Sequence, residues 1–230
     1  MTAPAVPGEV WLAPHIHIAR DGDDLVVLDV AADAYYCLPH AAGALQVADG
    51  GARLLGLAPQ VIDALLGIGA VADGAEPRRP TRYVAPARDL GGRVARRVGP
   101  GEVWDLATSL LQALVLFRRR DLQGLVGGWE ARPGRADPAR LERRALVFRT
   151  LWPWSPVQGA CLFQALVLRL FLRRGGLDAD WIFGVRTWPF SAHCWIQSGD
   201  LVLNDLAERA GAYRPMALDA QEIAAQANPE

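Results

Sequence analysis

The chain has 230 residues, 51% of them hydrophobic, and a formal net charge of −1. This length and composition predict a folded core of one domain or two small ones and exclude a disordered chain. All 24 basic residues are arginine, so a lysine nucleophile, Schiff base or lysine phosphate clamp is excluded.

Strands followed by short helices are predicted at the start of the chain. Alternating and β-branched residues predict strands within 10–18, 25–30 and 35–38. Pro39 suits the first turn of a helix that we expect to run to about Ala48. A second helix is expected over 59–66. These elements predict a first domain at residues 1–75, with a three-stranded sheet and short helices.

Clustered prolines and glycines follow, together with many arginines and few large apolar residues. This composition predicts a linker over residues 76–101. From residue 102 the apolar residues recur at helical spacing. Helices are expected from residue 102 to about Arg120, over 121–129 and over 138–151.

A loop at residues 152–160 leads into an expected helix at Cys161–Arg174, which Gly175 and Gly176 end. Strands are then expected at 179–185, 192–197 and 201–205. Residues 102–230 are therefore predicted to form a second domain, and the fold class is α+β.

The sequence also indicates the cellular location of the protein. The start has no basic segment followed by an apolar one, and no apolar stretch approaches the roughly 20 residues that span a bilayer. The three cysteines are too widely spaced for a disulfide framework, so the cytoplasm is expected.

Residues 75–150 hold sixteen basic and eight acidic residues. Their arginines are scattered with few aromatics between them, so a solvated face is favoured over nucleic-acid binding.

Cys161 lies at the start of a predicted helix, where unpaired N–H groups and the helix dipole favour a thiolate. His193 is the single histidine of the C-terminal half. If residues 198–200 form a three-residue turn centred on Gly199, Asp205 lies directly opposite His193 and can orient its ring. Alone, either Cys161 or His193 is better interpreted as a packing residue. Together with Asp205 they make a catalytic site about as probable as a structural one.

Other candidate residues have mostly structural interpretations. Cys194 alternates away from the face of His193 and is expected to be a small core residue, as is Cys37. Trp152 and Trp154 are as well explained by packing as by a substrate cleft. Gln158 is a candidate oxyanion donor because it precedes Cys161 closely. His15 and His17 share a strand face but offer too few ligands, so no metal site is predicted.

The segments around these residues resemble a known family. Cys161–Gly175, Ile182–Val185, Ala192–Ile196 and Val202–Asp205 together look like the transglutaminase-like cysteine peptidases of lasso-peptide biosynthesis. The resemblance covers about residues 100–210. It implies that Cys161 is the nucleophile, His193 the base and Asp205 the residue that orients the histidine. Cys194 stands where alanine is usual, and we expect this departure to matter little.

The first domain is similar to the precursor-recognition domain of the same pathways, which resembles a winged helix-turn-helix. The matching elements are the strand of Tyr35, Tyr36, Cys37 and Leu38 and the helix of Val61 and Leu65. The resemblance implies that a leader peptide binds here as an added strand. Residues 1–74 hold nine acidic and two basic residues, which opposes DNA binding and suits a leader with basic residues.

The resemblance implies a leader peptidase for a ribosomal precursor peptide, acting beside an ATP-using cyclase and needing no cofactor itself. Two alternatives stay open. A transglutaminase would use the same three residues to pass an acyl group to an amine. A non-catalytic adaptor would only bind the peptide for the cyclase.

Overall fold

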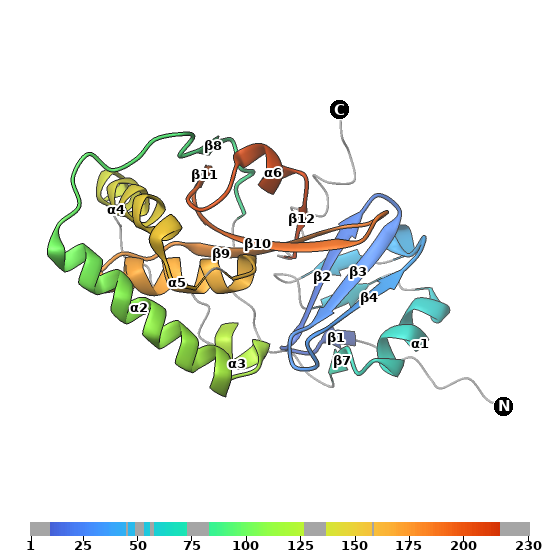
Figure 1. The fold of residues 1–230 in the computed structure, drawn as a ribbon. Coiled ribbons are helices and arrows are strands. Elements are labelled where there is room, and N and C mark those ends of the chain that lie inside the picture. The colour runs from blue at the N-terminus through green and yellow to red at the C-terminus, as the bar shows by residue number, and fades with distance from the viewer. Residues whose placement is uncertain are drawn as a thin grey trace. The chain divides into compact units, whose positions relative to one another are not determined.

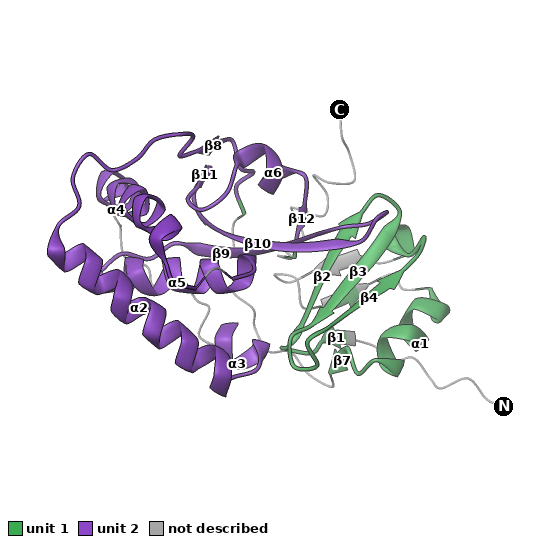
Figure 2. Cartoon of the chain, viewed as in Figure 1, with its two compact units in different colours: residues 1–83, 216–230 green, residues 84–215 purple. Residues whose placement is uncertain are grey.

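A computed structural model describes residues 10–44, 46–48, 53–55, 58–72, 83–126, 137–157 and 159–216. The chain forms two compact units (Figure 2). Unit 1 comprises residues 1–83 and 216–230, and unit 2 comprises residues 84–215. In the described part of the chain, no helix is long and apolar enough to cross a membrane.

Unit 1 contains two small antiparallel sheets and a short α-helix in its described residues (Figure 1). One sheet has the order β2-β3-β4 and the other β5-β6-β1-β7. The elements are β1 (Val10–Leu12), β2 (Ile16–Asp21), β3 (Asp24–Asp29), β4 (Ala34–Leu38), the 3-10 helix η1 (Ala42–Ala44), β5 (Gln46–Ala48), β6 (Arg53–Leu55), α1 (Pro59–Gly67) and β7 (Val71–Ala72).

The core of unit 1 lies between the strands and α1. All six residues of β3 are buried, and Leu25 and Val27 pack with Ile16 and Ile18 of β2. Leu65 of α1 is fully buried in the same cluster. A three-stranded sheet is present as expected, but the first expected strand, within 10–18, is divided between β1 and β2, which belong to different sheets. The four-stranded sheet was not predicted, because its strands are only two or three residues long.

The helix expected from Pro39 to Ala48 is wrong. His40 has a φ of 57°, in the left-handed region, so a right-handed helix cannot continue from Pro39. Only the short η1 follows, and Gln46–Ala48 then form β5, which pairs with β6.

Unit 2 has a five-stranded sheet of order β12-β9-β10-β11-β8 and a group of helices. The strands are β8 (Arg88–Asp89), β9 (Asp180–Arg186), β10 (Ser191–Ser198), β11 (Leu201–Val202) and β12 (Arg214–Pro215). The helices are α2 (Pro100–Arg119), α3 (Leu122–Val126), α4 (Pro138–Leu151), the 3-10 helix η2 (Trp152–Trp154), α5 (Cys161–Arg174) and α6 (Ala207–Gly211).

Helix α5 is the central element of unit 2. It packs against α2, α4 and β10, and Figure 1 shows the long strands β9 and β10 running past it. Its buried side chains lie all round the helix, including Phe163, Leu166, Phe171 and Leu172. A helix that is apolar all round is buried, and packing on all sides holds it in place. The nucleophile candidate therefore lies at the end of a firmly held element.

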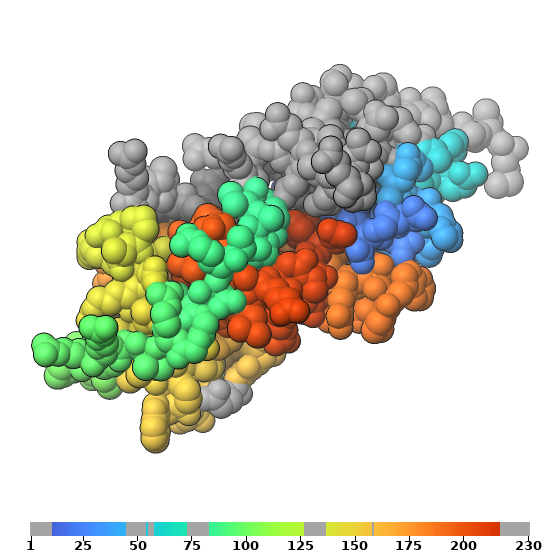
Figure 3. Space-filling view, turned by 90° about the horizontal axis from the view of Figure 1, so that it is seen from above, coloured from blue at the N-terminus to red at the C-terminus, as the bar shows by residue number. Residues whose placement is uncertain are grey.

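From Val84 onward, the expected linker belongs to unit 2. Strand β8 pairs in parallel with β11, and Leu90 is buried. The side chain of Arg88 makes two hydrogen bonds to Asp200, at 2.8 and 2.6 Å. In Figure 3 the green segment that contains β8 lies against the orange-red segment that contains β11. Residues 76–82 of the expected linker lie outside the described residues.

The predicted register of the last hairpin is wrong by one residue. Ser198 pairs with Leu201 and Gln197 with Val202, so the turn consists of only Gly199 and Asp200. Gly199 has a φ of 58°, which suits a two-residue hairpin turn. The strand expected over 201–205 ends at Val202, and the directly opposed pairing of His193 with Asp205 does not form.

Candidate active site

Cys161 is the first residue of α5. The preceding Ala160 has no capping side chain, and the first helical bond is from the Gln164 N–H to the Ala160 carbonyl. The N–H groups of the first turn before Gln164 therefore have no partner within the helix. They direct partial positive charge toward Cys161 and would do the same toward an oxyanion formed beside it.

His193 lies on β10 and is buried. Its Nε2 is hydrogen-bonded to Oδ2 of Asp205, and its side chain is also hydrogen-bonded to Cys161. Because Asp205 occupies Nε2, the other ring nitrogen, Nδ1, is left for the sulfur. The structure thus brings the three residues predicted from the sequence together, although not through the predicted strand register.

The chain turns back toward His193 after β11. Oδ1 of Asn204 accepts the N–H of Ile196 at 2.7 Å and so takes the place of a ladder partner on β10. Asp205 follows directly, and its Oδ1 accepts the N–H of Leu206 at 2.8 Å. An Asn side chain that ends the ladder therefore positions the carboxylate beside His193.

Asp89 of β8 holds the segment that carries Asp205. Its Oδ2 accepts the N–H of Ala207, the first residue of α6, at 2.9 Å, and its Oδ1 accepts the N–H of Gly91 at 2.6 Å. These backbone hydrogen bonds lower the pKa of Asp89, so its charge is maintained. Sequence analysis missed this residue, because two strand residues in a Pro- and Gly-rich stretch give no recognisable pattern.

Buried aromatic residues surround the His193 ring. The Trp195 ring lies 5.9 Å and the Tyr213 ring 5.2 Å from it, between centroids. The Trp195 indole donates to Gln197, whose amide donates to the carbonyls of Val84 and Gly199. The imidazole therefore lies among side chains that are themselves fixed.

Gly184 pairs with His193 across the sheet and leaves room for these rings. A Cβ atom at Gly184 would lie 2.8 Å from Cβ of Tyr213 and 3.0 Å from the Trp195 ring. Only glycine fits at this position without moving the residues that contact His193.

The pKa values of Cys161 and His193 move in opposite directions. Hydrogen bonds from the Cys194 thiol and from His193 lower the pKa of Cys161 to about 4, against the effect of burial. Burial lowers the pKa of His193, but hydrogen bonds to Asp205 and Cys161 outweigh it and raise the pKa to about 9. Near neutral pH the pair is therefore a thiolate and an imidazolium, the state of an activated cysteine nucleophile.

Asp205 remains ionised beside His193. Burial raises its pKa, but hydrogen bonds from His193 and the Leu206 N–H outweigh this and lower it. Arg209 of α6 adds a weaker attraction, with its Nε 3.8 Å from Oδ2 of Asp205. An ionised carboxylate here stabilises the imidazolium and fixes its ring.

Cys194 contacts Cys161, although strand alternation predicts that its side chain points away from the site. It is buried in the core as predicted, with 2% of its surface exposed. However, its thiol and its backbone N–H both hydrogen-bond to Cys161. Strand alternation predicts the direction of a side chain but does not predict what the backbone N–H of the same residue contacts. This contact could therefore not be predicted from the sequence.

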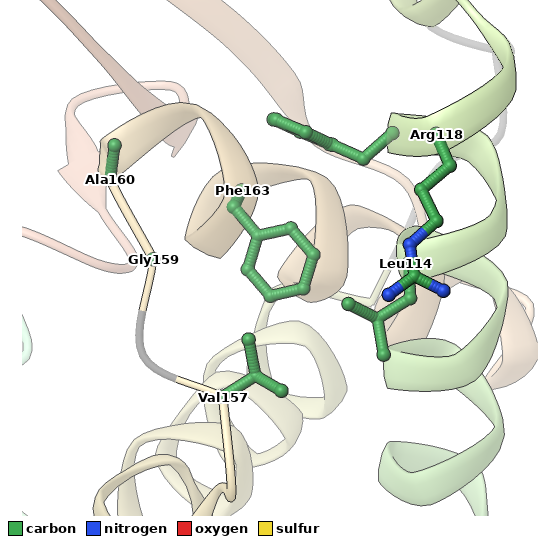
Figure 4. Close-up of a pocket in the computed structure, with 7 residues that line it drawn as sticks. Leu114, Arg118, Val157, Gly159, Ala160 and Phe163 are labelled. Atoms are coloured by element: carbon green, nitrogen blue, oxygen red, sulfur yellow. The ribbon is translucent and has the colours of Figure 1, made fainter.

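A pocket of about 330 Å³ adjoins the residues that precede Cys161 (Figure 4). Its walls come from α2, from the loop before α5 and from α5 itself, and Figure 4 shows the Phe163 ring between Leu114 and Ala160. The walls are apolar apart from one arginine. The lining residues are Leu114, Phe117, Arg118, Val157, Gly159, Ala160 and Phe163.

Trp152 and Trp154, the cleft candidates before Cys161, do not line this pocket. Trp154 of η2 is 85% exposed and does not line it. Gln158 lies outside the described residues, so its role as an oxyanion donor stays a prediction. Trp152 stacks on Phe148 of α4, with 5.1 Å between ring centroids, so packing accounts for it.

The expected leader-binding residues fall into two groups in unit 1. Tyr36, Leu38, Val61 and Leu65 belong to one core cluster, in which Leu65 is inaccessible. Tyr35 is partly buried. Cys37 is exposed on β4, so the expectation that it is a core residue is wrong. Among the described residues β4 pairs only with β3, so its other side is an open sheet edge.

Parts of the chain are similar to known proteins. Residues 107–218 match the family model described as Transglutaminase-like superfamily, and this range contains Cys161, His193 and Asp205. A 45-residue segment is 40% identical to the Microcin J25-processing protein McjB of Escherichia coli. The segment spans 20% of this chain and 22% of that protein. No solved structure matches the chain.

Proposed function

Since the chain carries a transglutaminase-like domain and resembles the lasso-peptide B proteins, we propose that it is a cysteine peptidase that removes the leader from a ribosomal precursor peptide. The observation that carries this proposal is the contact of Cys161 with His193, which Asp205 orients. A thiolate paired with an imidazolium is the reactive form of a cysteine peptidase.

The chemistry proceeds through an acyl-enzyme. The Cys161 thiolate attacks the scissile carbonyl carbon, and the resulting oxyanion lies near the free N–H groups of α5. The His193 imidazolium gives its proton to the leaving amine as the C–N bond breaks. His193 then removes a proton from water, which attacks the thioester, breaks the S–C bond and releases the leader carboxylate.

The pocket before α5 supplies a place for part of the substrate. Gly159 and Ala160 line it and directly precede Cys161, so a side chain within about three residues of the cut can reach it, at 3.3–3.6 Å per extended residue. Its volume of about 330 Å³ is at the small end of ligand pockets, which span about 300–1,000 Å³. An apolar side chain suits these walls better than a charged one.

Unit 1 is the proposed site of leader recognition, as a winged-helix-like domain. The open edge of β4 supports this, because an extended peptide can add to a sheet edge through main-chain hydrogen bonds. The partners are then the precursor and an ATP-using cyclase in the cytoplasm, which closes the freed core amine onto an acidic side chain. Tethering the leader raises the local concentration of the scissile bond at Cys161.

The test is cleavage of the precursor peptide encoded beside this gene, followed by mass spectrometry. Wild type is expected to release the leader, with and without the neighbouring cyclase and ATP. Cys161→Ala is expected to bind the precursor without cutting it. Equal cleavage by Cys161→Ala would overturn the catalytic assignment and favour a peptide-binding adaptor.

A second candidate is acyl transfer to an amine, because a transglutaminase uses the same three groups. The same reactions are therefore run with a glutamine-containing peptide and an amine acceptor. A mass gain that corresponds to the joined amine, without leader release, would replace hydrolysis by transfer.

A further inference from the structure

A second thiol lies beside the nucleophile, on a different element. Cys194 comes from β10 and Cys161 from α5, and these two elements pack together. The Ile196 N–H points toward Asn204 at the edge of β10 that faces β11. The N–H of Cys194, two residues earlier, points to the same edge, where it meets the Cys161 sulfur. The contact is therefore set by the backbones of two buried elements.

The two thiols differ in reactivity. Cys161 is half-buried, and its pKa of about 4 makes it a thiolate at neutral pH. Cys194 is buried, and its contact with Cys161 followed by burial raises its pKa, so it remains a neutral thiol. Peroxides react with thiolates rather than thiols. The first oxidation must therefore occur at Cys161.

We propose that Cys161 and Cys194 form an oxidation site, at which a hydroperoxide drives a reversible disulfide that blocks the nucleophile. In the first step the Cys161 sulfur takes an oxygen from hydrogen peroxide, giving a sulfenic acid, and the other oxygen leaves as water. In the second step the Cys194 sulfur attacks the Cys161 sulfur, the S–S bond forms, and the hydroxyl leaves as a second water. Two thiols are oxidised by one electron each, and the peroxide is reduced by two electrons.

Cys194 thereby protects the nucleophile. A sulfenic acid without a neighbouring thiol is oxidised further to a sulfinic acid, which thiol reductants do not restore. A disulfide is restored by a dithiol through exchange. This inference goes beyond the proposed peptidase function. The Cys161–Cys194 disulfide can be detected without any cleavage assay, so its test does not depend on that function.

The experiment treats the full-length protein with hydrogen peroxide, blocks free thiols and digests with trypsin. Because the chain has no lysine, cleavage after arginine places Cys161 in peptide 150–169 and Cys194 in peptide 187–209. Wild type is expected to give these two peptides joined, and a dithiol is expected to separate them. Cys37, in peptide 21–53, is an internal control, because burial and Asp24 raise its pKa. It is expected to stay reduced.

Cys194→Ala and Cys194→Ser are the matched variants, and their folding is checked by circular dichroism. Both are expected to accumulate sulfinic acid on peptide 150–169, which a dithiol does not reverse. Because each substitution also changes hydrogen bonding to Cys161, the ratio of reversible to irreversible product is compared, rather than the rate.

Cleavage of the precursor after oxidation is an additional measurement that depends on the proposed function. Wild-type activity is expected to return with dithiol, relative to the untreated sample, whereas that of the Cys194 variants is not. Sulfinic acid on wild-type Cys161 without joined peptides overturns the proposal. A disulfide whose reduction does not restore activity overturns its reversibility. Absence of cleavage before oxidation contradicts the peptidase function, and the joined peptides still decide the oxidation site.

Discussion

Asp89 accepts the backbone N–H of Ala207 at 2.9 Å and so ties β8 to the start of α6, two residues after Asp205. Asp89→Ala is expected to lower kcat for leader removal about tenfold or more, because small displacements of a catalytic group are costly. Steady-state cleavage assays measure this effect. Arg88→Ala, which removes an exposed ion pair to Asp200, is the control and is expected to change kcat little. Equal loss in both variants would contradict the role of Asp89.

The reactive ion pair predicts the pH dependence of the site. Cys161 becomes a thiolate as pH rises through about 4, and His193 loses its proton as pH rises through about 9. Cleavage is therefore expected to rise across the first pH and to fall across the second. Alkylation of peptide 150–169 by iodoacetamide gives the lower limit directly. If alkylation rises only near the ordinary thiol pKa of about 8.5, Cys161 is not activated.

Gly184→Ala is expected to destabilise unit 2 and to lower activity together. The added Cβ would lie 2.8 Å from Cβ of Tyr213, and overpacking of this kind costs about 1–3 kcal/mol. Thermal unfolding and cleavage assays measure the two effects. At Gly92 an added Cβ meets nothing within 4 Å, so Gly92→Ala is the matched control. A Gly184→Ala protein with wild-type melting temperature and activity would contradict this prediction, because it would show that Tyr213 and Trp195 can move without cost.

Leu114→Trp is expected to fill the pocket before α5 and to lower kcat/KM about tenfold or more for the precursor. The same variant is expected to lose any preference for an apolar side chain near the cut, measured with alanine-substituted precursors. Leu111→Trp places the same side chain one turn earlier, at a residue that is 64% exposed, and is expected to resemble wild type. If the two variants behave alike, the pocket does not hold substrate.

The grouping of Cys161, His193 and Asp205 could be predicted in part, because the position of Cys161 follows from local sequence. Gly175 and Gly176 mark the end of α5, and apolar spacing marks its body, so Cys161 is placed at its start. The partnership of His193 and Asp205 was inferred from a register that is wrong by one residue. It forms nevertheless, because Asn204 replaces a strand residue at the edge of β10 and brings Asp205 back toward the ring.

The remaining features depend on contacts that a sequence pattern does not show. The positive φ of His40 prevents the expected helix. It follows from tertiary structure, since no sequence pattern predicts which histidine adopts the left-handed conformation. The contact of Cys194 with Cys161 uses a backbone N–H that every residue has. The strands of the second sheet in unit 1 have only two or three residues, whereas a strand is recognised by alternation over about four to eight residues.

The pairing of β8 with β11 determines where the chain can be divided. A fragment that starts at residue 102, where the composition changes, would lack a whole strand of the five-stranded sheet. Leu201 and Val202 would then form a bare apolar edge, and such edges recruit strands from other molecules. That fragment is expected to self-associate and precipitate, whereas one that starts at or before Tyr83 retains the strand that closes the sheet.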